Sequence, residues 1–331
     1  MKIRRIIQVL TVILTLITAC GANTSARSDG YYGALNVSGG KLCDESGAQV
    51  QLKGVSTHGI AWFPGYVTKD SISYMHSNWK INCIRLAMYT DESGGYCNSD
   101  TASQEKLKKI IDTGVNAAAA NDMYAIIDWH ILSDGNPNTY IDQAEDFFDE
   151  MSLKYCRYDN VLYEICNEPN GGTTWGDIKS YAEDIIPIIH KNATNAVIIV
   201  GAPTWSQELD KAAADPIDDQ TNIMYALHFY AATHTDALRQ QTQNAIDGGL
   251  PVFVTEFGIC DASGNGQIDK EQANKWMELI DSNGLSCCQW NLSNKDETSA
   301  LIKPSCTKMS DWTKDDMSDS GLWMLENMKA F

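Results

Sequence analysis

Short apolar segments alternate with segments of helical periodicity along most of the 331-residue chain. Each apolar segment is bounded by polar residues, glycine or proline, a pattern typical of a buried strand. The eight strands predicted in this way cover residues 51–55, 83–87, 124–128, 161–166, 196–200, 223–227, 252–255 and 285–289.

Aliphatic residues recur three or four positions apart between these strands, as at Leu107, Ile111 and Val115. This spacing predicts amphipathic helices that bury one face. A possible capping box at residues 101–104 would start one helix, and Pro187 should kink another.

Eight strand–helix units in succession close most simply as a (β/α)8 TIM barrel. A doubly wound sheet is the alternative, but it would normally carry a glycine-rich phosphate turn after an early strand, and the sequence has none. Before the first barrel strand, residues 35–37 and 41–43 flank Gly39-Gly40, which predicts a small N-terminal β-hairpin. We therefore expect one α/β domain over residues 33–331.

The amino terminus has the composition of an export signal. Three cations among the first five residues precede an uncharged apolar stretch at 6–19, which is too short to span a membrane as a helix. Residues 1–20 are thus predicted to be a signal peptide. The sequence around Cys20 resembles a bacterial lipoprotein processing site, which predicts a lipid on this cysteine, and ordinary cleavage near Ala22 or Ala26 is the alternative.

Residues 21–32 lack periodicity and predict a polar tether between this anchor and the domain. The expected location is extracellular, on the outer face of a bacterial membrane that the protein contacts only through the lipid. The formal net charge of −18 argues against nucleic acid and polyanionic substrates, because phosphates and uronates would be repelled. A neutral polymer is indifferent to this charge.

Ten cysteines in an exported protein favour disulfides, but nine remain after Cys20, so at least one is unpaired in the monomer that we expect. Five lie in or beside apolar strands, where a free cysteine behaves as a small hydrophobic residue. These are Cys83, Cys166, Cys260, Cys287 and Cys288, whereas Cys43, Cys97, Cys156 and Cys306 are predicted to be peripheral. No cysteine or histidine spacing fits a zinc site, and no metal or organic cofactor is expected.

Polar and aromatic residues follow nearly every predicted strand. Two of them are glutamates that end apolar runs: Glu168, in front of Pro169, and Glu256, in front of Phe257-Gly258. Active sites of α/β barrels lie at the carboxyl ends of the strands, and two carboxylates on that face are what retaining glycoside hydrolysis requires. The other residues at strand ends are His58, Trp62, Arg85, Tyr89, His130, Asn167, Trp205, His228, Tyr230 and Trp290.

The sequence around these residues resembles glycoside hydrolase family 5 from about Gly33 to the carboxyl terminus. The resemblance rests on residues 84–89, 128–130, 163–170, 228–230, 255–258 and 290–293, and above all on the Asn-Glu-Pro and Glu-Phe-Gly elements in this order. Residues 58–63, 204–207, 261–266 and 294–301 are similar to bacterial endo-β-1,4-glucanases of that family. The sequence departs from the family's usual residues at Cys166, Ala61 and Ala202-Pro203. These differences are expected to change the fine shape of the cleft and not the chemistry.

The resemblance implies that Glu168 is the acid/base and Glu256 the nucleophile. The nucleophile must stay ionised, which requires a cation or hydrogen-bond donors nearby, and Arg85 and Tyr230 are the candidates. By the family's pattern, Asn167 should bind the 2-hydroxyl of the sugar at the cleavage point.

His130 and His228 are expected to bind sugar hydroxyls and to orient the carboxylates, and metal binding by these two is the weaker alternative. Glu164 precedes Glu168 by four residues, which at roughly 3.3 Å per residue is about 13 Å along the strand. It is therefore predicted to be a buried structural acid at the far end of the barrel.

The remaining site residues are implied to bind the substrate. Trp290 should form the floor of the cleavage subsite, with Trp62 in a subsite on the glycone side and Trp205 on the leaving-group side. His58, Tyr89, Ala262, Lys295 and Glu297 match glycone-side positions of the family. For Lys295 and Glu297, a solvated surface role is the alternative.

The sequence thus predicts a retaining endo-β-1,4-glucanase that acts on a neutral β-1,4-glucan. The same mechanism on mannan, mixed-linkage glucan or xyloglucan is the nearest alternative. A carbohydrate-binding lipoprotein with an inactive barrel is disfavoured, because both glutamates are present.

Overall fold

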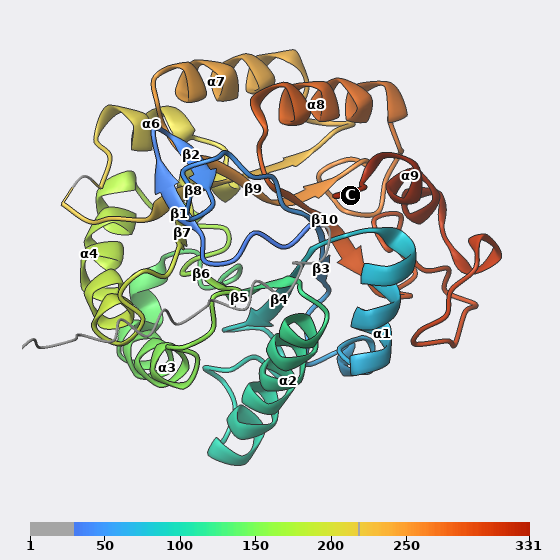
Figure 1. Ribbon diagram of the computed structural model, residues 1–331, viewed down its shortest axis with the longest axis horizontal. Coiled ribbons are helices and arrows are strands. Elements are labelled where there is room, and N and C mark those ends of the chain that lie inside the picture. The colour runs from blue at the N-terminus through green and yellow to red at the C-terminus, as the bar shows by residue number, and fades with distance from the viewer. Residues whose placement is uncertain (1–29, 218) are drawn as a thin grey trace, which may run out of the picture.

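A computed structural model describes residues 30–217 and 219–331 (Figure 1). Eight parallel strands close into a barrel in the order β10-β3-β4-β5-β6-β7-β8-β9, which confirms the predicted TIM barrel. The strands are β3 (Lys53–Thr57), β4 (Cys83–Tyr89), β5 (Tyr124–His130), β6 (Val161–Glu164), β7 (Ile198–Val200), β8 (Ile223–Tyr230), β9 (Val252–Gly258) and β10 (Cys287–Leu292).

All eight predicted strands occur, but several extend further toward their carboxyl ends than the sequence indicated. The predicted strands stopped near the last apolar residue, whereas pairing between β4 and β5 continues to Tyr89 and His130. The last residues of β8 and β9 are likewise still paired, Tyr230 opposite Gly258. These ends are polar or aromatic because they line the open end of the barrel rather than its core.

Helices surround the barrel and pack on its outer face (Figure 1). They are α1 (Lys69–Tyr74), α2 (Thr101–Ala120), α3 (Ile141–Lys154), α4 (Trp175–Asn192), α5 (Pro203–Ser206), α6 (Leu209–Ala214), α7 (Asp236–Asp247), α8 (Lys270–Asn283) and α9 (Asp319–Asn327). Short 3-10 or π turns lie at Pro64–Tyr66, Met75–Trp79, Pro137–Tyr140 and Lys314–Asp316.

The start of α2 corrects one prediction. The side chain of Asp100 caps this helix by accepting from the Ser103 N–H, so the predicted box at residues 101–104 is not the cap. Aspartate satisfies an N-terminal N–H group as well as threonine does, and the two alternatives differ by one residue. Helix α4 runs through Pro187 as a single element.

The amino end of the barrel is closed by the predicted hairpin, now β1 (Asn36–Ser38) and β2 (Lys41–Cys43), which are antiparallel. It lies across the barrel in Figure 1. Leu35 and Leu42 join an apolar cluster with inward-facing residues from the starts of the strands, such as Leu162. The core thus fills this end and leaves the opposite end open.

Two residues assigned to the tether belong to the folded domain. The ring of Tyr31 stacks on Tyr124 with centroids 5.3 Å apart, and the Tyr32 N–H donates to the Tyr124 hydroxyl at 2.9 Å. An aromatic pair can bury apolar area that the rest of the polar segment lacks. The predicted signal and Cys20 lie outside the described residues.

All nine cysteines of the described part are free, and the five predicted in strands are buried. Cys43 and Cys306 are buried as well, which corrects their predicted peripheral position. Cys43 belongs to the β2 strand of the hairpin that covers the barrel floor, so its side chain is shielded there. Among the described residues, the helices are all too short or too polar to cross a membrane.

Candidate active site

A cleft of about 540 Å³ opens at the carboxyl ends of the barrel strands. It gathers most of the residues predicted for the site, and they come from all eight barrel strands or the loops that follow them. The predicted residues that line it are His58, Tyr89, His130, Glu168, Trp205, Tyr230, Glu256, Ala262, Trp290, Lys295 and Glu297.

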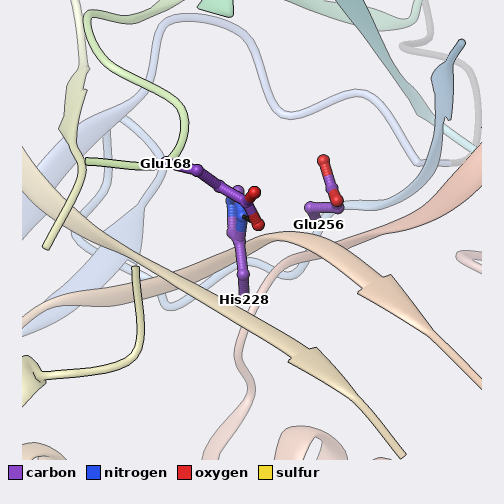
Figure 2. A group of neighbouring side chains, drawn as sticks. All are labelled: Glu168, His228 and Glu256. Atoms are coloured by element: carbon purple, nitrogen blue, oxygen red, sulfur yellow. Dashed lines mark hydrogen bonds and ion pairs between the residues drawn. The ribbon is translucent and has the colours of Figure 1, made fainter. Parts of the chain in front are cut away.

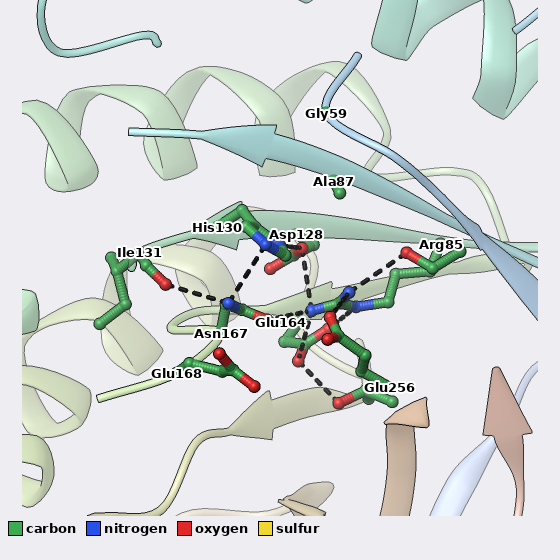
Figure 3. A network of polar contacts seen from close by, with 12 residues as sticks. Gly59, Arg85, Ala87, Asp128, His130, Ile131, Glu164, Asn167, Glu168 and Glu256 are labelled. Atoms are coloured by element: carbon green, nitrogen blue, oxygen red, sulfur yellow. Dashed lines mark hydrogen bonds and ion pairs between the residues drawn. The ribbon is translucent and has the colours of Figure 1, made fainter. Parts of the chain in front are cut away.

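Arg85 is the centre of a buried polar network beneath this cleft (Figure 3). Its Nη1 donates to Glu256 Oε2 at 3.0 Å, and its Nη2 donates to Asn167 Oδ1 at 2.6 Å. Its Nε donates to Glu164 Oε2 at 2.6 Å, and Asp128 Oδ2 lies 3.0 Å from Nη2. Burial alone would lower the pKa of Arg85, but the surrounding carboxylates raise it well above its ordinary value. The guanidinium is a fixed cation held in one orientation.

Glu256 receives a donor on each carboxylate oxygen. Arg85 occupies Oε2, and the Tyr230 hydroxyl donates to Oε1 at 2.8 Å. Burial and the charge of Glu256 raise the pKa of Tyr230 well above its ordinary value, so the phenol keeps its proton. The two donors hold the Glu256 carboxylate in one orientation.

The position of Glu164 differs from the prediction. The residue is fully buried, as expected, but its carboxylate shares Arg85 with Glu256 and therefore lies directly beneath the site. The distance of about 13 Å was counted along the backbone of one strand. The Arg85 side chain is long enough to contact both Glu164 and Glu256, although the two residues start at different depths in the barrel. Burial would raise the pKa of Glu164, but Arg85 holds it low, at about 2.

Glu168, in the loop after β6, faces Glu256 across the site and contacts His228 of β8 (Figure 2). His228 Nδ1 lies 3.0 Å from Glu168 Oε1. One ligand atom from each of Glu168, His228 and Glu256 can be chosen so that all lie within 4.8 Å of one another. The Glu168 side chain is 12% exposed and is thus accessible from the cleft.

The contact that His228 makes through Nε2, its other ring nitrogen, shows that Nε2 carries a proton. Thr255 Oγ1 donates to Glu164 Oε1 at 2.7 Å, so it has no second proton for the imidazole. Its 2.9 Å contact with His228 Nε2 must therefore be an N–H donated by the histidine. Any exchangeable proton of the pair is then located between His228 Nδ1 and Glu168 Oε1.

The surroundings of His228 favour its charged form. Burial lowers its pKa, but the nearby carboxylates of Glu164, Glu168 and Glu256 outweigh burial and raise the pKa to about 9. The contacts Glu168–His228–Thr255–Glu164–Arg85–Glu256 thus form one continuous chain between the two predicted catalytic carboxylates.

His130 is neutral and holds Asn167. Burial, followed by the charge of Arg85, lowers the pKa of His130 to about 3. Its Nδ1 donates to Asp128 Oδ2 at 2.5 Å, which leaves Nε2 to accept from Asn167 Nδ2 at 3.3 Å. The same Nδ2 donates to the Ile131 carbonyl at 3.0 Å. Both hydrogens of Asn167 Nδ2 thus have an acceptor, which fixes the orientation of the amide.

The rings of Trp290 and Tyr89 form one wall of the cleft, and Trp62 packs against Tyr89 outside this lining. Trp290 is 6% exposed and stacks on His130, with centroids 5.4 Å apart and planes 14° apart. Trp62 is 41% exposed and packs beside Tyr89 at 4.7 Å. Its indole N–H donates to the Ser93 carbonyl at 2.7 Å, which fixes the ring orientation.

Lys295 and Glu297 lie on the same side of the cleft as these rings. Lys295 Nζ lies 2.6 Å from Glu297 Oε2 and 3.1 Å from His58 Nε2. The Glu297 side chain is 9% exposed and also accepts from Asn291 Nδ2 at 2.8 Å. These contacts favour a place in the site over the solvated surface role that was the alternative. Burial and Lys295 lower the pKa of His58 to about 4, so this ring is neutral.

Trp205 stands on the opposite side, on an unusual turn. Thr204, Trp205 and Ser206 have φ values of 56°, 54° and 56°, a left-handed conformation that side chains other than glycine rarely adopt. The Trp205 N–H donates to the Pro169 carbonyl at 3.0 Å, and Ser206 Oγ donates to the Asn167 carbonyl at 2.7 Å. The turn is thereby attached to the segment that carries Glu168.

Comparison with known proteins agrees with this geometry. Residues 43–296 match the family model described as cellulase (glycosyl hydrolase family 5). The chain is 50% identical to endoglucanase A of Butyrivibrio fibrisolvens over 299 residues, which cover 90% of this chain and 69% of the relative. It is 45% identical to an endoglucanase of Clostridium saccharobutylicum, with 96% of this chain and 71% of the relative covered. This chain belongs to glycosyl hydrolase family 5.

Solved structures of family 5 enzymes superpose closely on the barrel. Cellulase Cel5C_n has a TM-score of 0.86 and 44% identity, and the match covers 90% of this chain and 92% of that one. The catalytic domain of Thermobifida fusca endoglucanase Cel5A has a TM-score of 0.84 and 38% identity, with 90% and 97% covered. The family 5 fold therefore extends over nearly all of the described domain.

Sequence reasoning missed two members of this family 5 site, Asp128 and Thr255. Both are buried strand residues that touch the predicted residues from beneath the cleft. A polar residue inside an otherwise apolar strand was the available signal, because a buried polar group needs a partner.

A metal at the group formed by Glu168, His228 and Glu256 is opposed by its surroundings. Both oxygens of Glu256 already accept from Arg85 and Tyr230, and the raised pKa of His228 favours a protonated ring that cannot act as a ligand. The donor set suits proton transfer in a family 5 hydrolase. His130 and His228, the pair considered for a metal from the sequence, are each engaged with carboxylates or amides of the network.

Proposed function

We propose that this chain is a retaining endo-β-1,4-glucanase that hydrolyses internal bonds of cellulose and related β-glucans. The observation that carries the proposal is the separation of Glu168 and Glu256, whose carboxylates approach to within 4.8 Å. Retaining glycosidases keep their two carboxyl groups about 5 to 5.5 Å apart, whereas inverting enzymes leave room for a water molecule between them.

In the first step, Glu256 attacks the anomeric carbon and Glu168 protonates the departing glycosidic oxygen. The C–O bond to the leaving chain breaks as the bond to Glu256 forms, which gives a covalent glycosyl-enzyme. In the second step, Glu168 takes a proton from water, and the water oxygen displaces Glu256. The 3.0 Å contact with His228 Nδ1 holds the Glu168 carboxyl group in place for both roles.

The network beneath the cleft supports each step. Arg85 and Tyr230 hold the Glu256 carboxylate in place beneath the substrate, so little reorganisation is needed when charge develops. Asn167 is proposed to bind the sugar 2-hydroxyl. Since both Nδ2 hydrogens already have acceptors, a bound hydroxyl would replace the longer of these contacts, the one to His130 at 3.3 Å.

The cleft supports a neutral polymer as the substrate. Trp290 in the cleft and the exposed Trp62 beside it offer ring faces for pyranose C–H groups. The other residues proposed for the glycone side are His58, Tyr89, Ala262, Lys295 and Glu297. Trp205 offers a ring on the leaving-group side. A structural neighbour, the Thermobifida fusca endoglucanase catalytic domain, has been crystallised with cellotetraose. Initial rates on carboxymethylcellulose, barley glucan, glucomannan and xyloglucan distinguish the glucan from the alternative substrates.

We also propose that the enzyme is exported and held at the outer face of the membrane through a lipid on Cys20. Labelled palmitate should then enter the protein, and Cys20→Ser should release the protein or block its processing. Unlabelled protein beginning near Asn23 would support ordinary secretion instead. Sedimentation of the purified domain tests the expected monomer.

The two glutamates are distinguished by chemical rescue. Glu256→Ala removes the nucleophile, so turnover of every substrate should fall by several orders of magnitude. Azide should restore turnover from the vacated face and yield the α-glycosyl azide.

Glu168→Ala removes the proton donor, which matters less for an activated aryl cellobioside than for cellulose, because the aryl leaving group needs little protonation. Azide should then accelerate the second step and yield the β-azide. The same anomer from both variants, or wild-type cellulose hydrolysis by Glu256→Ala, would refute the assignment.

A further inference from the structure

Asp128 lies beneath the cleft and contacts two residues of the proposed machinery (Figure 3). Its Oδ2 lies 3.0 Å from Arg85 Nη2 and 2.5 Å from His130 Nδ1. Its Oδ1 is buried as well and has no hydrogen-bond partner among the described residues. Asp128 is fully buried and does not line the cleft, so any effect that it has on a substrate must pass through these two neighbours.

The contacts of the Asn167 amide determine which nitrogen of His130 carries a proton. Arg85 Nη2 can only donate, so the amide atom 2.6 Å from it must be the oxygen, Oδ1. The amide nitrogen, Nδ2, then faces the Ile131 carbonyl at 3.0 Å and His130 Nε2 at 3.3 Å. An amide NH2 group is a donor only, so His130 Nε2 must be without a proton.

The single proton of the neutral His130 ring is therefore on Nδ1, where Asp128 Oδ2 accepts it. The partner of one ring nitrogen decides whether the other is protonated, and without Asp128 the ring could carry its proton on Nε2 instead. Two donors, His130 Nε2 and Asn167 Nδ2, would then face each other. The amide could not turn round to avoid this, because Arg85 requires its oxygen on the other side.

We propose that Asp128 is a positioning residue: it keeps His130 Nε2 unprotonated and thereby holds the Asn167 amide in the orientation that recognises the sugar 2-hydroxyl. This inference rests on the proposed function, in which Asn167 binds that hydroxyl. The hydroxyl takes the place of His130 Nε2 as the acceptor of one Nδ2 hydrogen. The direction of that hydrogen before binding therefore decides how well the hydroxyl is bound.

The proposed role needs an acceptor atom and not a charge. Burial raises the pKa of Asp128 well above its ordinary value; Arg85 opposes this shift, and the charges of Glu164 and Glu256 add to it. A proton bound by this carboxyl group goes to Oδ1, because Oδ2 already faces the donors of Arg85 and His130. Asp128→Asn imitates this protonated form, since Arg85 favours the amide oxygen at the Oδ2 position. Asp128→Ala removes the acceptor altogether.

The test compares 4-nitrophenyl β-cellobioside with the analogue that lacks the 2-hydroxyl on the sugar bonded to the nitrophenyl group. The readout is the ratio of the two kcat/KM values, which measures the preference for the complete substrate. In Asp128→Ala this ratio should fall about five- to tenfold, as expected when one hydrogen bond is misplaced. Asp128→Asn, the matched control, should keep the wild-type ratio within about twofold, whatever its absolute rate. A merely structural role would lower both kcat/KM values equally and leave the ratio unchanged.

Nitrogen-15 NMR of protein with labelled histidine supplies a readout that does not depend on activity. Wild type and Asp128→Asn should show an unprotonated Nε2 in His130, and Asp128→Ala should show a protonated Nε2 or exchange between the two forms. The signal is assigned by its loss in His130→Asn. An unchanged ratio or an unchanged tautomer in Asp128→Ala would overturn the proposed role.

Loss of the preference in Asp128→Asn would overturn the role as well, and this outcome decides the question even if Asp128→Ala does not fold. Wild-type protein inactive on 4-nitrophenyl β-cellobioside would instead refute the proposed function itself, so the two failures are distinguishable.

Discussion

The charge of His228 makes a measurable contribution to stability that depends on pH. Its pKa is raised from the ordinary 6.5 to about 9, because the nearby carboxylates of Glu164, Glu168 and Glu256 outweigh burial. The folded state thus binds this proton more tightly than the unfolded chain does. The resulting stability is fully present below pH 6.5 and is lost as the pH rises through 9.

The magnitude follows from the two pKa values. A shift from 6.5 to about 9 corresponds to about 3 kcal/mol, of which about 2 kcal/mol should disappear between pH 7 and pH 9.5. The variant His228→Asn lacks the titrating group. The free energy of unfolding of wild type should therefore fall by about 2 kcal/mol more than that of the variant across this interval.

The assay is guanidinium unfolding at pH 7 and pH 9.5 with a reductant present, since the described cysteines are free. His130→Asn is the matched control, because the pKa of His130 is lowered to about 3 and this ring stays neutral over the whole interval. The alkaline limb of kcat/KM on cellohexaose should fall near pH 9, where His228 loses its proton beside Glu168. Parallel stability curves for wild type and His228→Asn, within about 0.5 kcal/mol, would refute the reasoning.

Three further predictions concern single contacts. Thr255→Val keeps the side-chain shape but removes the donor to Glu164, so it should cost about 1–3 kcal/mol and shift the alkaline limb of kcat/KM; an unchanged pH profile would contradict the continuous chain. Trp290→Ala should raise KM for cellohexaose and lower the unfolding free energy by about 3–5 kcal/mol, because the ring is buried against two histidines; calorimetry and initial rates check both effects. Asp100→Ala should cost about 1 kcal/mol in thermal unfolding through the lost cap of α2 and leave kcat/KM unchanged, so a loss of activity would show that the effect is not local.

The sequence was sufficient for the barrel and for the residues at its open end. Strands with apolar side chains on both faces leave a strong signal, and a glutamate before Pro169 or before Phe257-Gly258 marks where such a strand stops. The resemblance to family 5 then supplied roles that the spacing alone does not assign. The strand ends were misplaced by a few residues because residues such as Tyr89 and His130 are paired in the sheet although they face the cleft.

The network beneath the cleft could not be derived in the same way. Glu164, Asp128 and Thr255 meet around Arg85 and His228 because a closed barrel brings side chains from different strands to the same depth. Counting residues along one strand gives no information about its partners on the others. Only the three-dimensional arrangement shows that an acid four residues before Glu168 lies beneath the site and not far from it.

The packing of Tyr31 and Tyr32 beside Tyr124 has a consequence for how the enzyme would be displayed on a cell. These contacts attach the start of the described chain to the amino end of the barrel, and the cleft opens at the other end. A surface that holds the protein through its amino terminus would therefore lie behind the barrel floor. The cleft would face outward, toward polymers in the medium, and long glucans could be bound without steric hindrance from the envelope.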